Sequence, residues 1–99
     1  MALIVNWSPQ AKEDLQNIIT RMQEAADEAQ LKNFIRFLDK KIELIAAMPE
    51  MFPPSRLKHG LRRCVVTRYN TLYYQVKNEE IEYEEVEIIA LLNNISQEV

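Results

Sequence analysis

The stretch RLKHGLRRCVVTRYNTLYYQVK, residues 56–77, decides the fold because it breaks the pattern of the chain before it. Residues 61–68 and 71–77 are rich in Val, Thr and Tyr, which are residue types that favour β-strands. Tyr69 and Asn70 separate these two runs and provide a turn between them. The stretch therefore predicts a β-hairpin.

The alternation of side chains along this hairpin predicts which residues face the core. Tyr74 falls on the same side as the apolar Leu72 and Val76, so it is expected in the core. Tyr73 points the other way and is expected at the surface. Cys64 is expected to be a buried strand thiol, because the chain has no second cysteine for a disulfide and no paired histidine that would support metal binding or nucleophilic chemistry.

The chain before residue 50 has the spacing of two helices. Ser8 and Pro9 indicate a helix start, since serine caps free amides and proline suits the first helical position. A break within residues 26–30 predicts an antiparallel helical hairpin, and the second helix is expected to end before Pro49. Steps of three and four residues define the two apolar stripes, which are Ala11, Leu15, Ile18, Ile19, Met22 and Ala25, then Leu31, Phe34, Ile35, Leu38, Ile42 and Ile45.

Two further strands complete the predicted order. Residues 2–6 form a short first strand, and a last strand reaches Leu92 after a turn at residues 77–80. The late part of the last strand is apolar on both faces, which is typical of a strand inside a sheet. Its alternation shifts between Tyr83 and Val86, which predicts a bulge or a long turn there. The order β-α-α-β-β-β predicts one α+β domain over residues 1–99, with the N-terminal strand and the helical hairpin packed on an antiparallel sheet.

The composition limits the classes of function. Of the 99 residues, 47% are hydrophobic and 27% are charged, as is typical of a globular protein. There is no basic region of a signal peptide and no apolar run near the ~20 residues of a membrane span, so a soluble cytoplasmic protein is expected. Six glutamates within residues 79–87 lack a ligand pattern, so neither a metal nor a cofactor is expected. These glutamates are expected to be solvated or to meet the basic strands.

The charge of the hairpin region differs from that of the rest of the chain. The protein has 12 Lys and Arg against 15 Asp and Glu, for a net charge of −3. Residues 51–78 contain six cations and no acid, so this segment has a charge of +6 and the remainder −9. One interpretation is a surface that meets phosphates or an acidic protein. The other is a solvated hairpin edge, where cations discourage pairing with another sheet. The candidate target-binding residues are Arg56, Lys58, Arg62, Arg63, Arg68 and Tyr73.

Two residues of this segment are candidate catalytic residues. His59 is the single histidine, and histidine is the side chain that most often serves as a general acid or base. The alternative is an ordinary polar residue of a loop. Arg68 is the cation that would hold a phosphate. Gly60, the single glycine, is expected to allow an unusual backbone angle at the entry to the strand.

These segments, in this order, resemble the RelE/ParE toxin superfamily of bacterial type II toxin–antitoxin systems. VNWSPQAKEDLQNII, residues 5–19, is similar to the opening strand and capped helix of that family. PPSRLKHGLRRCVVTRYNTLYYQVKNEEIE, residues 53–82, is similar to its core of a loop, an arginine-bearing strand, a tyrosine-bearing strand and a turn. The resemblance implies the β-α-α-β-β-β layout and a small cytoplasmic toxin. It also implies a cognate antitoxin that holds the toxin inactive in a hetero-oligomer.

The superfamily contains two branches with different targets. One branch cleaves ribosome-bound mRNA with basic residues and a C-terminal tyrosine, and the other poisons DNA gyrase. Thr71 stands where the ribonuclease branch usually has a catalytic arginine. The tail LLNNISQEV, residues 91–99, has neither a cation nor a tyrosine, whereas Arg62 matches an arginine that is frequent in the gyrase branch. The resemblance is therefore closer to the ParE-like branch.

The resemblance thus implies a ParE-like toxin that inhibits gyrase and replication by binding. Two alternatives remain open from the sequence. One is a RelE-like, ribosome-dependent mRNA endoribonuclease. Its phosphate and proton chemistry would have to come from Arg56, Lys58, His59, Arg62 and Arg68, with Arg68 and His59 as the candidate catalytic residues. The other is a degenerate, non-toxic protein that still binds an antitoxin.

Overall fold

The computed structural model describes residues 3–78 and 84–94, and its helices and strands follow the predicted order. The turn predicted at residues 77–80 and the irregularity predicted after Tyr83 lie partly outside the described residues. The elements are β1 (Ile4–Trp7), α1 (Pro9–Glu24), α2 (Glu28–Ala47), β2 (Arg62–Val65), β3 (Asn70–Asn78) and β4 (Glu84–Asn93).

The strands form one sheet in the order β1-β4-β3-β2. β3 pairs antiparallel with both β2 and β4, which confirms the predicted hairpin. β1 lies parallel to β4, with Ile4 opposite Glu85 and Trp7 opposite Ile88. The three strands after the helices form the antiparallel sheet that was predicted, and the N-terminal strand joins it in parallel, so the complete sheet is mixed. Alternating side chains specify the buried face of a strand but not its direction, so the parallel edge had no signal in the sequence.

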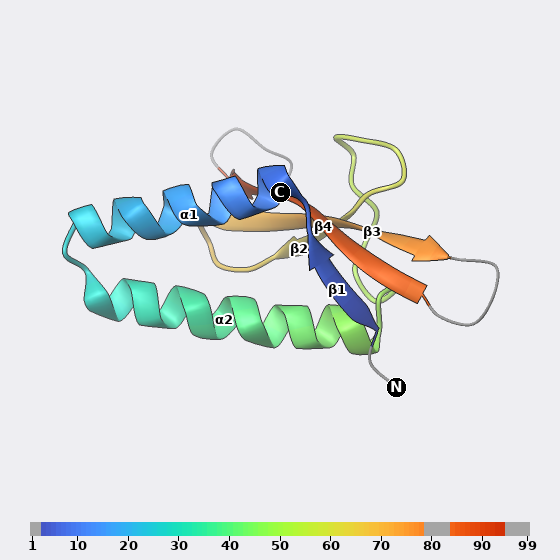
Figure 1. Ribbon diagram of the computed structural model, residues 1–99, viewed down its shortest axis with the longest axis horizontal. Helices are drawn as coiled ribbons and strands as arrows, with labels where there is room; N and C mark the ends of the chain where they lie inside the picture. Colours follow the sequence, from blue (N-terminus) through green and yellow to red (C-terminus); the bar gives the residue numbers. More distant parts are fainter. Residues whose placement is uncertain (1–2, 79–83, 95–99) are drawn as a thin grey trace.

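The helices cover one face of the sheet, and the turn that joins them extends past the strands at one end of the molecule (Figure 1). α1 packs along β4, and α2 reaches β1. The core between the layers contains Phe34 and Ile45 from α2 and Leu72, Tyr74 and Ile88 from the strands, each at most 1% exposed. Tyr74 is thus in the core, as predicted. The longest dimension of the molecule is 47 Å.

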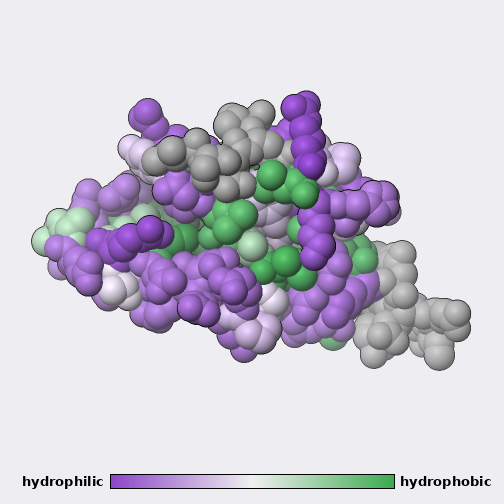
Figure 2. Space-filling view, turned by 90° about the horizontal axis from the view of Figure 1, so that it is seen from above, coloured by the Kyte–Doolittle hydropathy of each residue, from purple (hydrophilic) through white to green (hydrophobic). Residues whose placement is uncertain are grey.

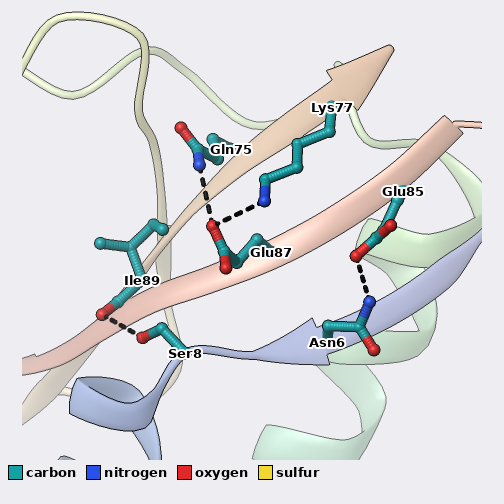
Figure 3. A network of polar contacts seen from close by, with 7 residues as sticks. All are labelled: Asn6, Ser8, Gln75, Lys77, Glu85, Glu87 and Ile89. Carbon is teal, nitrogen blue, oxygen red and sulfur yellow. Dashed lines mark hydrogen bonds and ion pairs between the residues drawn. The ribbon is translucent and has the colours of Figure 1, made fainter. Parts of the chain in front are cut away.

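The junction of β1 and α1 is built around Ser8. Its hydroxyl oxygen caps α1 by accepting from the backbone N–H of Ala11 at 3.0 Å. Its O–H donates to the carbonyl oxygen of Ile89 at 2.9 Å (Figure 3). Ile89 is the extra residue of a β-bulge in β4, where the register with β3 shifts. Further along α1, Asp14 Oδ2 accepts from the N–H of Leu91 at 3.0 Å, so α1 is fixed to β4 both at the bulge and beyond it.

The two helices are joined at residues 25–27, which lie at the start of the predicted break. Asp27 caps α2 by accepting from the backbone N–H of Gln30 at 3.0 Å. Ala26 has a φ of 54°, in the left-handed region that glycine adopts more readily than alanine. A Cβ in this region costs about 1–2 kcal/mol. The helix turn is therefore strained at Ala26.

Replacing Ala26 with glycine is expected to raise the free energy of unfolding by about 0.5–1 kcal/mol. Glycine removes the Cβ from the left-handed position, although it also gives the unfolded chain more freedom. Ala25→Gly is the matched control, because Ala25 has a φ of −76° and glycine there should lower the free energy by about 0.5–1 kcal/mol. Urea unfolding of both variants measures the difference, and equal destabilisation by both would contradict the strain.

Candidate target-binding surface

The exposed cations of the basic segment do not form one cluster, since three of them lie at the two ends of β2 and the fourth, Lys77, lies on β3. Arg56, Lys58 and the neighbouring His59 are exposed in the loop before β2, and Arg68 is exposed in the turn after it. β2 alone spans about 10 Å. The two candidate catalytic residues, His59 and Arg68, therefore do not converge on one phosphate.

The loop between α2 and β2 is held along the outer edge of β2. The N–H of Ser55 donates to the carbonyl oxygen of Leu61 at 2.7 Å, and the N–H of Arg63 donates to that of Pro53 at 3.0 Å. Gly60 has a φ of 89°, which confirms the unusual backbone angle expected before the strand. Because this loop occupies the edge of β2, cations are not needed to protect that edge from pairing with another sheet.

Arg62 and its cross-strand partner Tyr74 tie down the start of this loop. Nη1 of Arg62 donates to the carbonyl oxygen of Phe52 at 2.7 Å and to that of Glu50 at 3.3 Å. The hydroxyl of Tyr74 donates to the carbonyl oxygen of Pro49 at 2.5 Å. Arg62 therefore has a structural role, and its contribution to target binding stays a prediction.

Tyr73 does not lie at the surface, since it is 1% exposed. The expectation of an exposed ring that could stack on a base is therefore wrong. Tyr73 lies on the sheet face away from the helices, opposite Arg63 of β2 and Ala90 of β4. The alternation predicted this face correctly but could not show that the ring is covered there. Arg63 is half-buried, and its Nε has no hydrogen-bond partner among the residues that the structure describes.

Glu87 of β4 pairs with Lys77, the last cation of the basic segment (Figure 3). Nζ of Lys77 lies 3.3 Å from Oε1 of Glu87, and the same oxygen accepts from Nε2 of Gln75 at 2.9 Å. On β4, the carboxylate of Glu85 accepts from the side-chain amide of Asn6, which lies on the neighbouring strand β1. The expected contact between the glutamates and the basic strands is therefore confirmed for Glu87, and Lys77 adds little to a positive surface.

Two weakly acidic groups of the core have raised pKa values. Burial raises the pKa of the Cys64 thiol to about 11, and the charge of Lys41 opposes this shift. Burial also raises the pKa of the Tyr74 hydroxyl to about 12, where Arg62 lowers it and Cys64 raises it further. Both side chains are 0% exposed. Cys64 is thus the buried strand thiol that was predicted, and a neutral buried thiol is a poor nucleophile.

The free energy of unfolding is expected to fall as the pH rises above 9. The unfolded chain loses the Cys64 proton near pH 9.0 and the Tyr74 proton near pH 10.0, whereas the folded chain keeps them up to about pH 11 and 12. The folded state binds more protons in this window, so its stability is full below pH 9 and is lost as the pH rises through the folded pKa values. For each group, the difference between the folded and unfolded pKa corresponds to about 2–3 kcal/mol in the free energy of unfolding.

Urea unfolding between pH 8 and pH 11 measures this slope. Cys64→Val removes the titrating thiol and keeps an apolar side chain, so the fall between pH 9 and pH 11 should become shallower. An unchanged slope in that variant would show that the thiol is not responsible.

Within residues 3–78 and 84–94, no three His, Cys, Asp or Glu side chains are grouped as metal ligands. The helices described here lack the length and hydrophobicity that a membrane span requires.

The family model described as the ParE toxin of the type II toxin–antitoxin system parDE matches residues 5–93. The chain belongs to the ParE toxin family. This membership confirms the resemblance inferred from residues 5–19 and 53–82. Comparison with curated protein sequences finds no match.

Solved structures share the fold of this ParE family member. A chain described as the chromosomal ParDE TA system from P. aeruginosa has a TM-score of 0.72 at 13% identity, over 93% of this chain and 96% of that one. The YoeB/ParE toxin from Agrobacterium tumefaciens has a TM-score of 0.65 at 13% identity, over 93% and 99%. The conserved hypothetical protein HP0894 from Helicobacter pylori has a TM-score of 0.56 at 21% identity, over 93% and 94%.

This ParE-family chain contains a hydrogen-bond network around Asn94 that the sequence did not predict. Its side chain accepts from the hydroxyl of Thr71 at 2.5 Å and donates to the carbonyl oxygens of Thr67 at 3.2 Å and Arg68 at 3.0 Å. Its backbone N–H donates to the carbonyl oxygen of Tyr69 at 2.9 Å. Asn94 therefore holds the turn that presents Arg68. These side-chain partners are 23 to 27 residues away in sequence, so no local pattern marks Asn94.

Proposed function

We propose that this protein is the toxin component of a type II toxin–antitoxin system and inhibits growth by binding DNA gyrase in the cytoplasm. In this proposal a cognate antitoxin holds it inactive in a hetero-oligomer. The observation that carries the proposal is the match to the ParE toxin family over residues 5–93. The two alternative functions, a ribosome-dependent ribonuclease and a non-toxic protein that binds an antitoxin, predict different results in the experiments below.

Two features favour binding over RNA cleavage. Thr71, which stands where the ribonuclease branch usually has a catalytic arginine, is 1% exposed and donates its hydroxyl to Asn94. It is engaged in the fold and has no charge with which to hold a phosphate. His59 and Arg68 lie at opposite ends of β2, whereas cleavage needs proton-transfer and phosphate-holding groups at one site.

The loop before β2 is the surface that we assign to the target. Arg56 and Lys58 are exposed there, and Leu57 between them is 50% exposed. The hydroxyl oxygen of Ser55 accepts from the N–H of Leu57 at 3.0 Å, and Arg62 holds the start of the loop. Two cations on either side of an apolar side chain suit an acidic protein surface, because opposite charge guides association and the apolar contact adds affinity.

Pulse labelling in bacteria after induction of this chain without a partner tests the target. We expect thymidine incorporation to fall within minutes while methionine incorporation persists. Purified protein should also inhibit supercoiling by gyrase. A fall in translation before DNA synthesis would overturn the proposal in favour of the ribonuclease. Unaffected growth, supercoiling and translation would overturn it in favour of the non-toxic protein.

Charge reversal tests the surface assigned to the target. Arg56→Glu combined with Lys58→Glu is expected to abolish growth inhibition, because both cations of the loop are reversed. Lys12→Glu combined with Lys40→Glu makes the same change of charge at exposed positions of α1 and α2 and should leave growth inhibition intact. Circular dichroism of all variants checks that they are folded. Equal effects of the two pairs would contradict the assignment to the loop.

A further inference from the structure

A depression lies at the end of the molecule where α1 turns into α2, between these helices and the turn that joins β2 to β3. Its volume is about 280 Å³, close to the roughly 300 Å³ of the smallest ligand pockets. Its apolar lining comes from Ile18 and Met22 of α1 and from Ala25, which caps that helix. Figure 2 shows that this end of the molecule is weakly hydrophobic (pale green) and bordered by hydrophilic side chains. The depression has room for one small ligand and not for a folded partner.

Tyr69 forms an aromatic side of the depression. Its side chain is 51% exposed, which for a single residue is ordinary on a protein surface. Its backbone, however, is held by two hydrogen bonds. Its N–H donates to Oγ1 of Thr67 at 3.1 Å, and its carbonyl oxygen accepts from the N–H of Asn94 at 2.9 Å. A flat ligand that stacks on this ring therefore has little backbone ordering to bring about.

Two arginines bring positive charge to the depression. Arg21, in the last turn of α1, lines it, and Cζ of Arg68 lies 5.3 Å from the centre of the Tyr69 ring. Both arginines are exposed, and in residues 3–78 and 84–94 neither has a carboxylate within 4 Å. The part of the chain that the structure describes contributes no Asp or Glu to this lining, whereas Asp27 lines the two neighbouring depressions. Guanidinium groups in this arrangement suit a phosphate, which they bind with paired hydrogen bonds.

Three side-chain amides complete the lining, from Gln30 of α2, Asn70 of β3 and Asn93 of β4. Each amide carries both a donor and an acceptor. Asn70 is 6% exposed, and its Nδ2 donates to the carbonyl oxygen of Leu92 at 3.5 Å, so this amide is fixed in the wall. The side chains of Asn and Gln pair with the adjacent donor and acceptor of adenine, which are its N6 amino group and N7. The polar lining therefore matches the edge of an adenine base.

We propose that this depression binds an adenine nucleotide. The base stacks on the Tyr69 ring and presents its edge to the amides, and the phosphate pairs with Arg21 and Arg68. The chemistry is the same for a free nucleotide and for one nucleotide of a single strand, because both expose a base and a phosphate. The inference goes beyond the proposed function and does not depend on it, since the depression is separate from the loop assigned to the target.

An acidic peptide fits the same residues less well. Its carboxylates would use the two arginines but would leave the Tyr69 ring and the amides without a matching group. Inorganic phosphate would likewise use the arginines alone. A nucleotide engages the ring, the amides and the arginines together, so each of these three parts can be tested separately.

Isothermal titration calorimetry of the full chain with adenosine monophosphate tests the proposal. Adenosine monophosphate should bind at least tenfold more tightly than inorganic phosphate, adenosine or uridine monophosphate. Tyr69→Ala should weaken binding at least tenfold, whereas Tyr69→Phe keeps the ring and should stay within twofold of the wild type. Arg21→Glu should weaken binding at least tenfold. Lys12→Glu makes the same charge change at an exposed position of α1 and should stay within twofold.

A single strand of eight deoxyadenosine nucleotides distinguishes the two sources of the nucleotide. If the strand and adenosine monophosphate compete, the depression accepts a nucleotide from either source. If only the strand binds, and both Tyr69→Ala and Arg21→Glu weaken it, the nucleotide belongs to a strand.

Four results would overturn the proposal. They are no binding of either probe, inorganic phosphate or uridine monophosphate binding as tightly as adenosine monophosphate, equal effects of Tyr69→Ala and Tyr69→Phe, and equal effects of Arg21→Glu and Lys12→Glu. Circular dichroism of each variant checks that it is folded. Growth inhibition by the wild type is measured separately, so a failure of the proposed function leaves this test unchanged.

Discussion

Replacing Asn94 with alanine is expected to lower the free energy of unfolding by about 3 kcal/mol. The substitution removes three side-chain hydrogen bonds, and a hydrogen bond of this kind contributes about 1 kcal/mol. It also leaves the hydroxyl of Thr71, a residue that is 1% exposed, without the acceptor that it now has. Urea unfolding measures the change, and faster hydrogen exchange in residues 67–70 would show that the turn opens first.

Two further variants identify which part of the network matters. Asn94→Asp keeps an oxygen that accepts from Thr71 but loses the two bonds donated to the turn, and it places a charged oxygen beside their carbonyls. We expect a loss of about 2–3 kcal/mol from this variant. Asn17→Ala, at an exposed position of α1, should change the free energy by less than about 0.5 kcal/mol. If Asn94→Ala behaved like Asn17→Ala, the network would contribute nothing to stability.

Replacing Arg62 with alanine is expected to lower the free energy of unfolding by about 2–3 kcal/mol. A charged donor contributes about 1.5–3 kcal/mol through its hydrogen bonds, and Arg62 donates to the carbonyl oxygens of both Glu50 and Phe52. Residues 49–61 should become more sensitive to limited proteolysis, because the start of this loop loses both bonds to the guanidinium while it keeps the bond from the Tyr74 hydroxyl. Chemical denaturation and mass spectrometry of the first cleavage products measure both effects.

Matched variants distinguish the hydrogen bonds of Arg62 from its charge. Arg62→Lys keeps the charge but lacks the guanidinium, so it should recover less than half of the loss. Lys58→Ala removes an exposed cation of the same loop and should change the free energy by less than about 0.5 kcal/mol. Full recovery by lysine would mean that charge, and not the hydrogen bonds to the loop, accounts for the effect.

The order of helices and strands could be predicted because it depends on local periodicity. The apolar stripes of residues 11–25 and 31–45 predict helices, and the alternation of residues 71–77 predicts a strand. Each of these patterns involves only residues that are close together in the sequence. The parallel pairing of β1 with β4 joins residues about 80 positions apart, for example Ile4 with Glu85, and nothing local encodes it. The same limit explains Tyr73, whose face of the sheet was predicted correctly while its burial depends on distant parts of the chain.

The candidate site could be predicted as a set of residue types but not as an arrangement. The absence of acids from residues 51–78 drew attention to the cations of this segment, and the structure shows that Arg56, Lys58 and Arg68 are exposed. Their division between two ends of β2 follows from the path of the loop, which the sequence does not specify. In the sequence, Arg62 cannot be distinguished from the other cations of the segment. Its hydrogen-bond acceptors are backbone carbonyl groups 10 and 12 residues earlier. Asn94 reads as an ordinary residue of the tail.

The position of β4 has a consequence for how a cell makes this protein. Among the helices and strands of residues 3–78 and 84–94, β4 is the last to be synthesised, yet it lies between β1 and β3 in the sheet. Until it emerges from the ribosome, β1 has no strand to pair with, and the core lacks Val86, Ile88 and Leu91, which are at most 3% exposed in the complete fold. Such long-range pairing must wait for both segments. A chain truncated after Asn78 should accordingly show no cooperative unfolding transition. The core can therefore be completed only after residues 84–93 have been synthesised.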